Sequence, residues 1–81
     1  MKTDKQRQAV IASVVRALRE AREGQGLSMS AVAERAGLSQ QMVSYVERQM
    51  RMPTLDTVLR MADALEVDLS DLLRKARKSV D

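Results

Sequence analysis

The stretch of the chain that decides its fold is SMSAVAERAGLSQQMVSYVE, residues 28–47. Ser28 and Ser39 each open one half of it, and serine is a favoured N-cap because its hydroxyl accepts a hydrogen bond from the first helical turn. Gly37 lies between the halves and can adopt the left-handed conformation that ends a helix. Ala33 is small enough to let two helices cross closely. The stretch therefore predicts two short helices joined by a tight turn.

The second predicted helix has an apolar side and a polar side. Val43 and Val46 fall on the apolar side at helical spacing. The polar side carries two amides, a hydroxyl, a phenol and a guanidinium, contributed by Gln40, Gln41, Ser44, Tyr45 and Arg48. A glutamine amide donates and accepts together, which matches the N6 and N7 edge of adenine in the major groove. These residue types in this pattern predict a helix-turn-helix DNA reader, with the first residues of its second helix nearest the bases.

Two charged residues fall on apolar faces. Glu47 shares the face of Val43 and Val46, and Arg22 lies at the centre of the apolar stripe of an earlier helix. That stripe consists of Ile11, Val14, Val15 and Leu18. A buried charge costs several kcal/mol unless it is paired. Arg22 and Glu47 are therefore expected to form an ion pair that ties the first helix to the helix beginning at Ser39.

The remaining sequence predicts an all-α fold of five helices in a single domain over residues 1–81, with the helix-turn-helix at about residues 28–48. The first helix is long, from about Lys5 to Glu23, and stops at Gly24-Gln25-Gly26. Thr54 caps the fourth helix, and Asp68 or Ser70 begins the fifth. The apolar residues of the fourth helix are Leu55, Val58, Leu59, Ala62 and Leu65, and those of the fifth are Leu69, Leu72, Leu73 and Ala76.

Composition excludes several classes of function. The 81 residues contain no cysteine and no histidine, so we expect no disulfide, no metal site, no cofactor and no catalytic residues. The N-terminus is polar and no apolar run is long enough to cross a bilayer, which indicates a cytoplasmic protein without a membrane partner. The net charge of +3 permits a polyanionic partner.

Residues 22–73 resemble the phage repressor and Cro type of helix-turn-helix, the XRE family. The matching positions are Leu27-Ser28, Ala33, Ala36-Gly37-Leu38-Ser39, Gln40-Gln41, Val43, Val46-Glu47-Arg48, Pro53-Thr54, Leu59, Ala64-Leu65-Glu66-Val67 and Leu72-Leu73. The resemblance implies that Gln40, Gln41 and Tyr45 contact bases. It also implies that Ser44 and Arg48 lie at the DNA surface and that Arg22 pairs with Glu47.

The chain departs from the family pattern in three places. Met29 replaces a glutamine that usually touches backbone phosphate. Gln49 replaces the glycine common two residues after the glutamate, which predicts strain in the loop. The first helix also starts about ten residues earlier than is usual in the family.

The predicted DNA-binding set is Ser39, Gln40, Gln41, Ser44, Tyr45, Arg48 and Arg51. The glutamines, the tyrosine and the arginines in it each have a structural alternative. Gln40 and Gln41 could be solvated residues of a first turn, and Tyr45, the one aromatic residue, could belong to the core. Arg48 and Arg51 could grip phosphate or solubilise a loop, and the nearby Met50 and Met52 could pack in the loop or form a flexible contact surface.

The predicted function is a sequence-specific DNA-binding transcriptional regulator, most simply a repressor that binds a pseudo-palindromic operator as a dimer. The dimer surface is expected on the fifth helix, through Leu69, Leu72 and Leu73, or on Val10 and the extended first helix. One alternative is an antitoxin that binds its own promoter and a toxin. Another is a protein-interaction module that keeps the fold without binding DNA.

Overall fold

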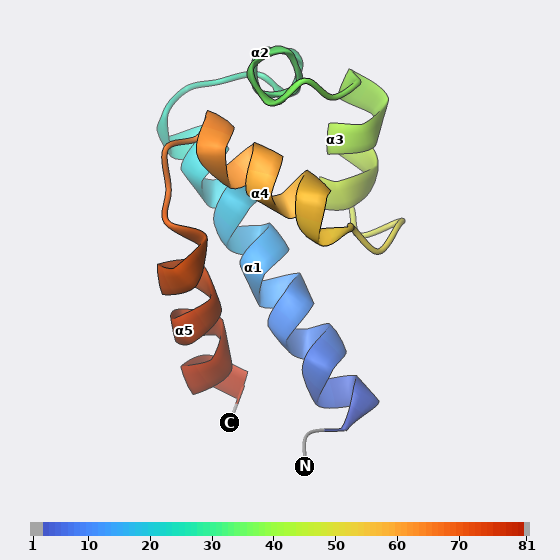
Figure 1. Ribbon diagram of the computed structural model, residues 1–81, viewed down its shortest axis with the longest axis vertical. Helices are drawn as coiled ribbons and strands as arrows, with labels where there is room; N and C mark the ends of the chain where they lie inside the picture. The colour runs from blue at the N-terminus through green and yellow to red at the C-terminus, as the bar shows by residue number, and fades with distance from the viewer. Residues whose placement is uncertain (1–2, 81) are drawn as a thin grey trace.

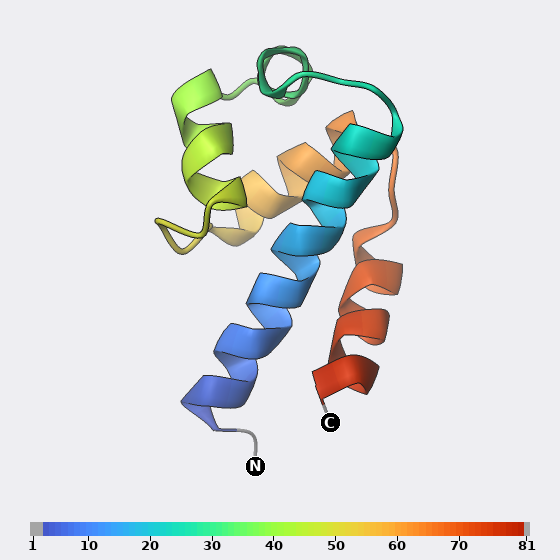
Figure 2. The ribbon, with the colours of Figure 1, turned by 180° about the vertical axis from the view of Figure 1, so that it is seen from behind.

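The computed structural model describes residues 3–80, and these residues form five helices. They are α1 (Asp4–Gly24), α2 (Met29–Ala36), α3 (Gln40–Glu47), α4 (Leu55–Ala64) and α5 (Leu69–Val80). The predicted all-α architecture is therefore confirmed. Helices α1 and α5 lie side by side and run in opposite directions, while α2 and α3 sit at the end of the molecule away from both termini (Figure 1). The view from behind shows that α4 crosses α1 between the α2–α3 end of the molecule and α5 (Figure 2).

The helices begin where short polar side chains can accept a first-turn N–H. The hydroxyl groups of Ser28, Ser39 and Thr54 each accept a hydrogen bond from the backbone N–H three residues later, at 3.0, 3.0 and 3.1 Å. Thr3 caps α1 in the same way, and its own amide donates to the side chain of Gln6. The three predicted caps are confirmed, whereas the capping box at Thr3 was not anticipated.

Asp68, rather than Ser70, precedes the first residue of α5. Its carboxylate accepts the Ser70 backbone N–H at 2.8 Å. Hydrogen bonds from the side chain and the backbone of Ser70 hold the pKa of Asp68 below its ordinary value, because they stabilise the ionised carboxylate. The start of α5 is therefore fixed by a charged cap.

All five helices contribute to one hydrophobic core. Its buried members are Val10, Val14, Val15, Leu18, Val32, Ala33, Val43, Val46, Met61, Ala62, Leu65 and Ala76. The core contains no aromatic side chain, so its packing depends on aliphatic residues that interdigitate between crossing helices. The predicted stripe of α1 is nearly correct: Val14, Val15 and Leu18 are buried, while Ile11 is only partly buried.

The apolar face predicted for α4 is partly wrong. Leu55 and Leu59 are 68% and 42% exposed, and Thr57 and Met61 are buried in their place. At 100° per residue, the apolar and buried residues of α4 span an arc of about 200° around the helix, with Thr57 at one edge and Leu59 near the other. The helices packed against α4 cover less than this arc. The two leucines lie at the uncovered edge of this arc.

Val10 does not form an external surface, contrary to one of the two predicted dimer contacts. It is 8% exposed and belongs to the same core cluster as Ala76 of α5. The extended first half of α1 thus provides the surface against which α5 packs (Figure 1). Among residues 3–80, no helix combines the length and the apolar character needed to cross a membrane.

Candidate nucleic-acid interface

The turn between α2 and α3 has the geometry predicted from its glycine. Gly37 has φ +70° and ψ 34°, in the left-handed region. Leu38 donates its N–H to the carbonyl of Ala33 at 2.9 Å, which closes the end of α2. Ala33 is 3% exposed and Val43 is fully buried, so the two short helices meet over small and aliphatic side chains. The turn therefore sets the position of α3 relative to α2.

Arg60 of α4 supports this turn from outside the predicted motif. Its Nη1 donates to the carbonyl of Ala36 at 3.3 Å, and its Nε donates to Asp56 Oδ2 at 2.9 Å. A Cβ atom added to Gly37 would lie 3.1 Å from the same Nη1. The spacing of Asp56 and Arg60 in the sequence predicts a pair along one helix. Nothing in the sequence indicates that Arg60 also contacts the carbonyl of Ala36, 24 residues earlier.

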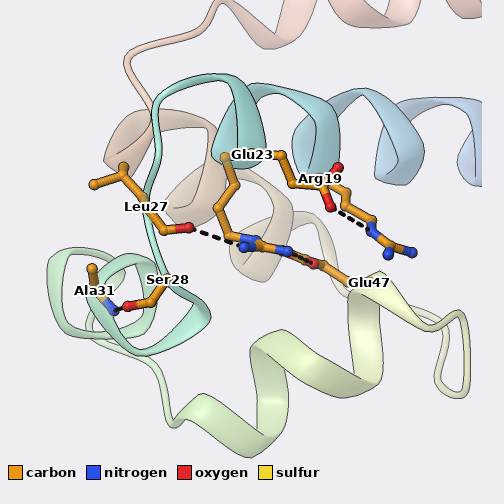
Figure 3. Close-up of polar contacts among 7 residues, drawn as sticks. Arg19, Glu23, Leu27, Ser28, Ala31 and Glu47 are labelled. Atoms are coloured by element: carbon orange, nitrogen blue, oxygen red, sulfur yellow. Dashed lines mark hydrogen bonds and ion pairs between the residues drawn. The ribbon is translucent and has the colours of Figure 1, made fainter.

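Arg22 and Glu47 form the expected ion pair. Arg22 Nε lies 2.7 Å from Glu47 Oε2, and Nη2 lies 2.9 Å from Oε1, so the pair is bidentate. Arg22 Nη1 also donates to the carbonyl of Leu27 at 2.9 Å. Figure 3 shows these contacts converging from Leu27 and Glu47. One guanidinium thus joins the end of α1, the connection to α2 and the last residue of α3.

This pair is nearly removed from solvent. The side chain of Arg22 is 11% exposed and that of Glu47 is 1% exposed. The hydrogen bond with Glu47 raises the pKa of Arg22 above its already high ordinary value, so the charge persists. The neighbouring pair of Arg19 and Glu23 is different, because its atoms are 3.6 Å apart and both side chains are half-exposed. Such a surface pair contributes little to stability.

The predicted DNA-binding residues of α3 lie on the side opposite its core residues. Gln40, Gln41, Ser44, Tyr45 and Arg48 fall within an arc of about 140° at 100° per residue. Gln40, Gln41 and Arg48 are exposed, as are Ser39 before the helix and Arg51 after it, while Ser44 and Tyr45 are half-buried. The structure thus brings the whole set to one face of α3 and its flanking residues.

Tyr45 contacts two other members of this set, which the sequence pattern did not reveal. Gln41 Nε2 donates to Tyr45 Oη at 2.7 Å. The guanidinium carbon of Arg51 lies 5.3 Å from the centroid of the Tyr45 ring, within the range of a cation–π interaction. The spacing of Gln41 and Tyr45 by four residues was the available signal for the first contact. Nothing in the sequence placed Arg51 over the ring.

Met29 and Gln49, which depart from the family pattern, differ in their surroundings. Met29 is half-buried and packs against the core, where the family glutamine would face phosphate. Gln49 has φ +57°, a conformation that is unfavourable for a residue with a side chain, so the predicted strain is present. Met50 and Met52 beyond it are 61% and 58% exposed and form part of the surface.

The described residues offer few other candidate sites. Within residues 3–80, no group of three acidic, histidine or cysteine side chains could hold a metal ion. One cleft of about 190 Å³ lies between α1 and the loop after α3. A second, mainly apolar cleft of about 160 Å³ lies between α1, α4 and α5. Its lining residues are Ile11, Val14, Val15, Pro53, Leu55, Val58, Leu69 and Leu73.

Comparison with known proteins finds the same motif. Residues 18–72 match the family model HTH_3, described as Helix-turn-helix. A putative HTH-type transcriptional regulatory protein of Methanocaldococcus jannaschii is 38% identical over 52 residues, which is 64% of this chain and 16% of that protein. An uncharacterized HTH-type transcriptional regulator of Mycobacterium tuberculosis is 39% identical over 59 residues, which is 73% of this chain and 42% of that protein. The chain thus spans less than half the length of these relatives.

Solved structures include two similar helical proteins. The restriction-modification controller protein C.AhdI from Aeromonas hydrophila matches with a TM-score of 0.70 and 34% identity, covering 76% of this chain and 94% of that one. A mutant of the restriction-modification controller protein C.Esp1396I matches with a TM-score of 0.77 and 20% identity, covering 88% and 92%. The second match supports the fold alone.

We predict that Glu47→Ala destabilises the fold by about 3 to 5 kcal/mol, because it leaves the buried Arg22 without its partner. Glu23→Ala is the matched control, since it removes the same side chain from the half-exposed pair with Arg19 and should change stability by less than about 1 kcal/mol. Thermal and denaturant unfolding measure both. Equal melting of Glu47→Ala and the wild type would contradict a stabilising role of the pair.

We also predict that Gly37→Ala destabilises more than Gly26→Ala. Both glycines have positive φ, which costs alanine about 1 to 2 kcal/mol, but only Gly37 has Arg60 within contact of an added Cβ. Gly24→Ala, at the end of α1 with open space around it, should be neutral or stabilising by up to about 1 kcal/mol. Adding Arg60→Ala should bring the cost of Gly37→Ala down to that of Gly26→Ala. Equal costs for the two single variants at positive φ would rule out the Arg60 contact.

Proposed function

The chain belongs to the helix-turn-helix family HTH_3, and from this premise we propose that it is a sequence-specific DNA-binding transcriptional regulator. The observation that carries the proposal is the polar face of α3, which lies opposite Val43 and Val46 and begins at an exposed helix N-terminus. The names of its relatives as HTH-type regulators support the same function. We expect no enzymatic activity, because the chain has no histidine and no cysteine.

In the proposed complex, α3 enters the major groove. Gln40 and Gln41 lie at its first turn, where side chains of a recognition helix reach base edges. Arg48 and Arg51 supply positive charge for phosphates on either side of the groove. Ser39 keeps its hydroxyl proton for a phosphate oxygen, because its oxygen already accepts the Met42 amide. Ser44 completes the surface.

We propose that the protein binds as a homodimer through the face formed by α4 and α5. Leu55 and Leu73 line the apolar cleft and are 68% and 41% exposed. Leu69 and Leu72 of the predicted surface are half-buried beside them. Two copies joined here would present two α3 helices to successive major grooves, as a pseudo-palindromic operator requires. A dimer bound over a promoter acts most simply as a repressor.

A narrower second candidate is control of a restriction-modification system. The structure of C.AhdI is named as such a controller, is 34% identical and is aligned over 94% of its length. The selection experiment below also tests this candidate, because the selected sequence should then occur beside restriction-modification genes in the source genome. A regulator of other genes would have its operator elsewhere.

The first prediction of the proposal is that selection from a random duplex library yields a two-fold symmetric motif with half-sites about one helical turn apart. Gln40→Ala should lose discrimination at one base position per half-site, worth about 1 to 3 kcal/mol, with unchanged melting. Gln8→Ala, the same change on exposed α1, should select the wild-type motif.

Absence of any enriched sequence at low salt would refute DNA recognition and favour a module that binds protein partners. Salt dependence provides the second check, because binding through phosphates weakens linearly in log K against log salt. A mainly apolar protein interface would respond little.

The proposed dimer depends on the apolar face that includes Leu73. Leu73→Asp should shift sedimentation toward the monomer and reduce affinity for the symmetric duplex, because it places a charge in the apolar face. Lys75→Ala is the matched control: it lowers the net charge by the same single unit from an exposed position on α5. A wild-type protein that stays monomeric at high micromolar concentration, with and without DNA, would rule out this dimer.

A further inference from the structure

We propose that Tyr45 is a positioning residue that sets base specificity through Gln41 and holds Arg51 for phosphate, instead of contacting a base itself. The inference rests on the proposed function and deepens it. Two contacts meet on the side chain of Tyr45: Gln41 donates a hydrogen bond to its hydroxyl at 2.7 Å, and the guanidinium of Arg51 lies over its ring. Together these contacts form an ordered array on the exposed face of α3.

The contact with Gln41 fixes an amide without using up its ability to read a base. A glutamine amide has two N–H donors and one carbonyl acceptor. Donation to Tyr45 Oη occupies one N–H and leaves the second N–H and Oε1 free. That donor and acceptor are the two groups that bind N7 and N6 of adenine. Tyr45 therefore orients the amide of Gln41 while leaving its adenine-reading edge open.

The anchor for this orientation is Tyr45 itself. Its side chain is half-buried, whereas that of Gln41 is exposed. A free glutamine loses rotamer freedom when it binds, and the loss weakens discrimination between the right base and a wrong one. A glutamine already held by a neighbour on the next turn of the helix has less freedom to lose. The hydroxyl of Tyr45 is thus the part of the side chain that affects specificity.

The contact with Arg51 uses a different part of Tyr45. Arg51 follows the strained Gln49 in the loop after α3, and its guanidinium carbon lies 5.3 Å from the ring centroid. A cation over an aromatic face is attracted by the ring and keeps its N–H groups at its edge for other partners. The ring thus holds a loop arginine beside α3, where phosphate contacts contribute affinity without sequence information. The ring affects affinity and salt dependence, and the hydroxyl affects base choice.

Two variants of Tyr45 separate these roles. Tyr45→Phe keeps the ring and removes the hydroxyl, so discrimination at the base read by Gln41 should fall by about 2- to 12-fold, the range expected for one released side chain. Its salt dependence should match that of the wild type. Tyr45→Leu removes both contacts and should also lower the slope of log K against log salt by about 0.9, the amount for one phosphate. Arg51→Ala should lower the slope alone.

The decisive measurement is binding to the selected duplex and to its single-base variants by wild type, Tyr45→Phe, Gln41→Ala and the double variant. If Tyr45 acts through Gln41, the double variant discriminates no worse than Gln41→Ala. A further loss in the double variant would mean that the Tyr45 hydroxyl contacts DNA directly, and unchanged discrimination by Tyr45→Phe would mean that it has no role. Either result overturns the inference and leaves the proposed function intact.

The array can also be tested in the free protein. Tyr45 is the one aromatic residue of the chain, so the near-ultraviolet circular dichroism spectrum arises from it. Gln41→Ala and Arg51→Ala should each change this spectrum, while Gln40→Ala should leave it unchanged. Identical spectra in all three variants would refute the array. If the wild-type protein selects no duplex, the proposed DNA binding is wrong, whereas identical spectra would show only that the Tyr45 contacts are absent. The two failures are therefore distinguishable.

Discussion

The ion pair between Arg22 and Glu47 is the interaction on which the position of α3 depends. It is bidentate, nearly inaccessible to solvent and extended by the hydrogen bond from Arg22 to the carbonyl of Leu27. Because a buried charge is costly without its partner, the fold tolerates few arrangements of α1 and α3 in which these groups are apart. The pair therefore selects one orientation for a helix of only eight residues. The apolar contacts of Val43 and Val46 then stabilise that orientation.

The rest of the structure adds supports around this constraint. The long α1 carries Arg22 at one end and packs against α5 along its other half, so the scaffold of the motif extends through the whole described chain (Figure 2). Arg60 of α4 donates a hydrogen bond to the carbonyl of Ala36, the last residue of α2. The outer face of α3 carries polar groups that are exposed or half-buried, and Tyr45 on this face contacts Gln41 and Arg51. Rigid support behind a polar face is what base readout needs, because a loosely held helix would lose discrimination.

The sequence predicted those parts of the molecule that depend on local rules. Caps such as Ser28 and Ser39 follow from the hydrogen bonding of a serine hydroxyl, and the left-handed Gly37 follows from its lack of a Cβ atom. The pairing of Arg22 with Glu47 follows from periodicity and from the cost of buried charge. Features that depend on tertiary geometry were not predictable. The sequence did not show which edge of the wide apolar arc of α4 the neighbouring helices would leave uncovered, so the exposure of Leu55 was not predictable. The stacking of Arg51 on Tyr45 depends on the path of a loop.

The surface that we propose to bind DNA consists of α3 and its flanking residues. The most direct test is to assign the backbone amides and follow their NMR chemical shifts as the selected duplex is added. We predict the largest changes at residues 39–51 and at the first turn of α2, and small changes at the exposed positions of α5, which would lie far from the duplex. Large changes confined to α1 and α5, with the amides of Gln40 and Gln41 unmoved, would contradict this proposal.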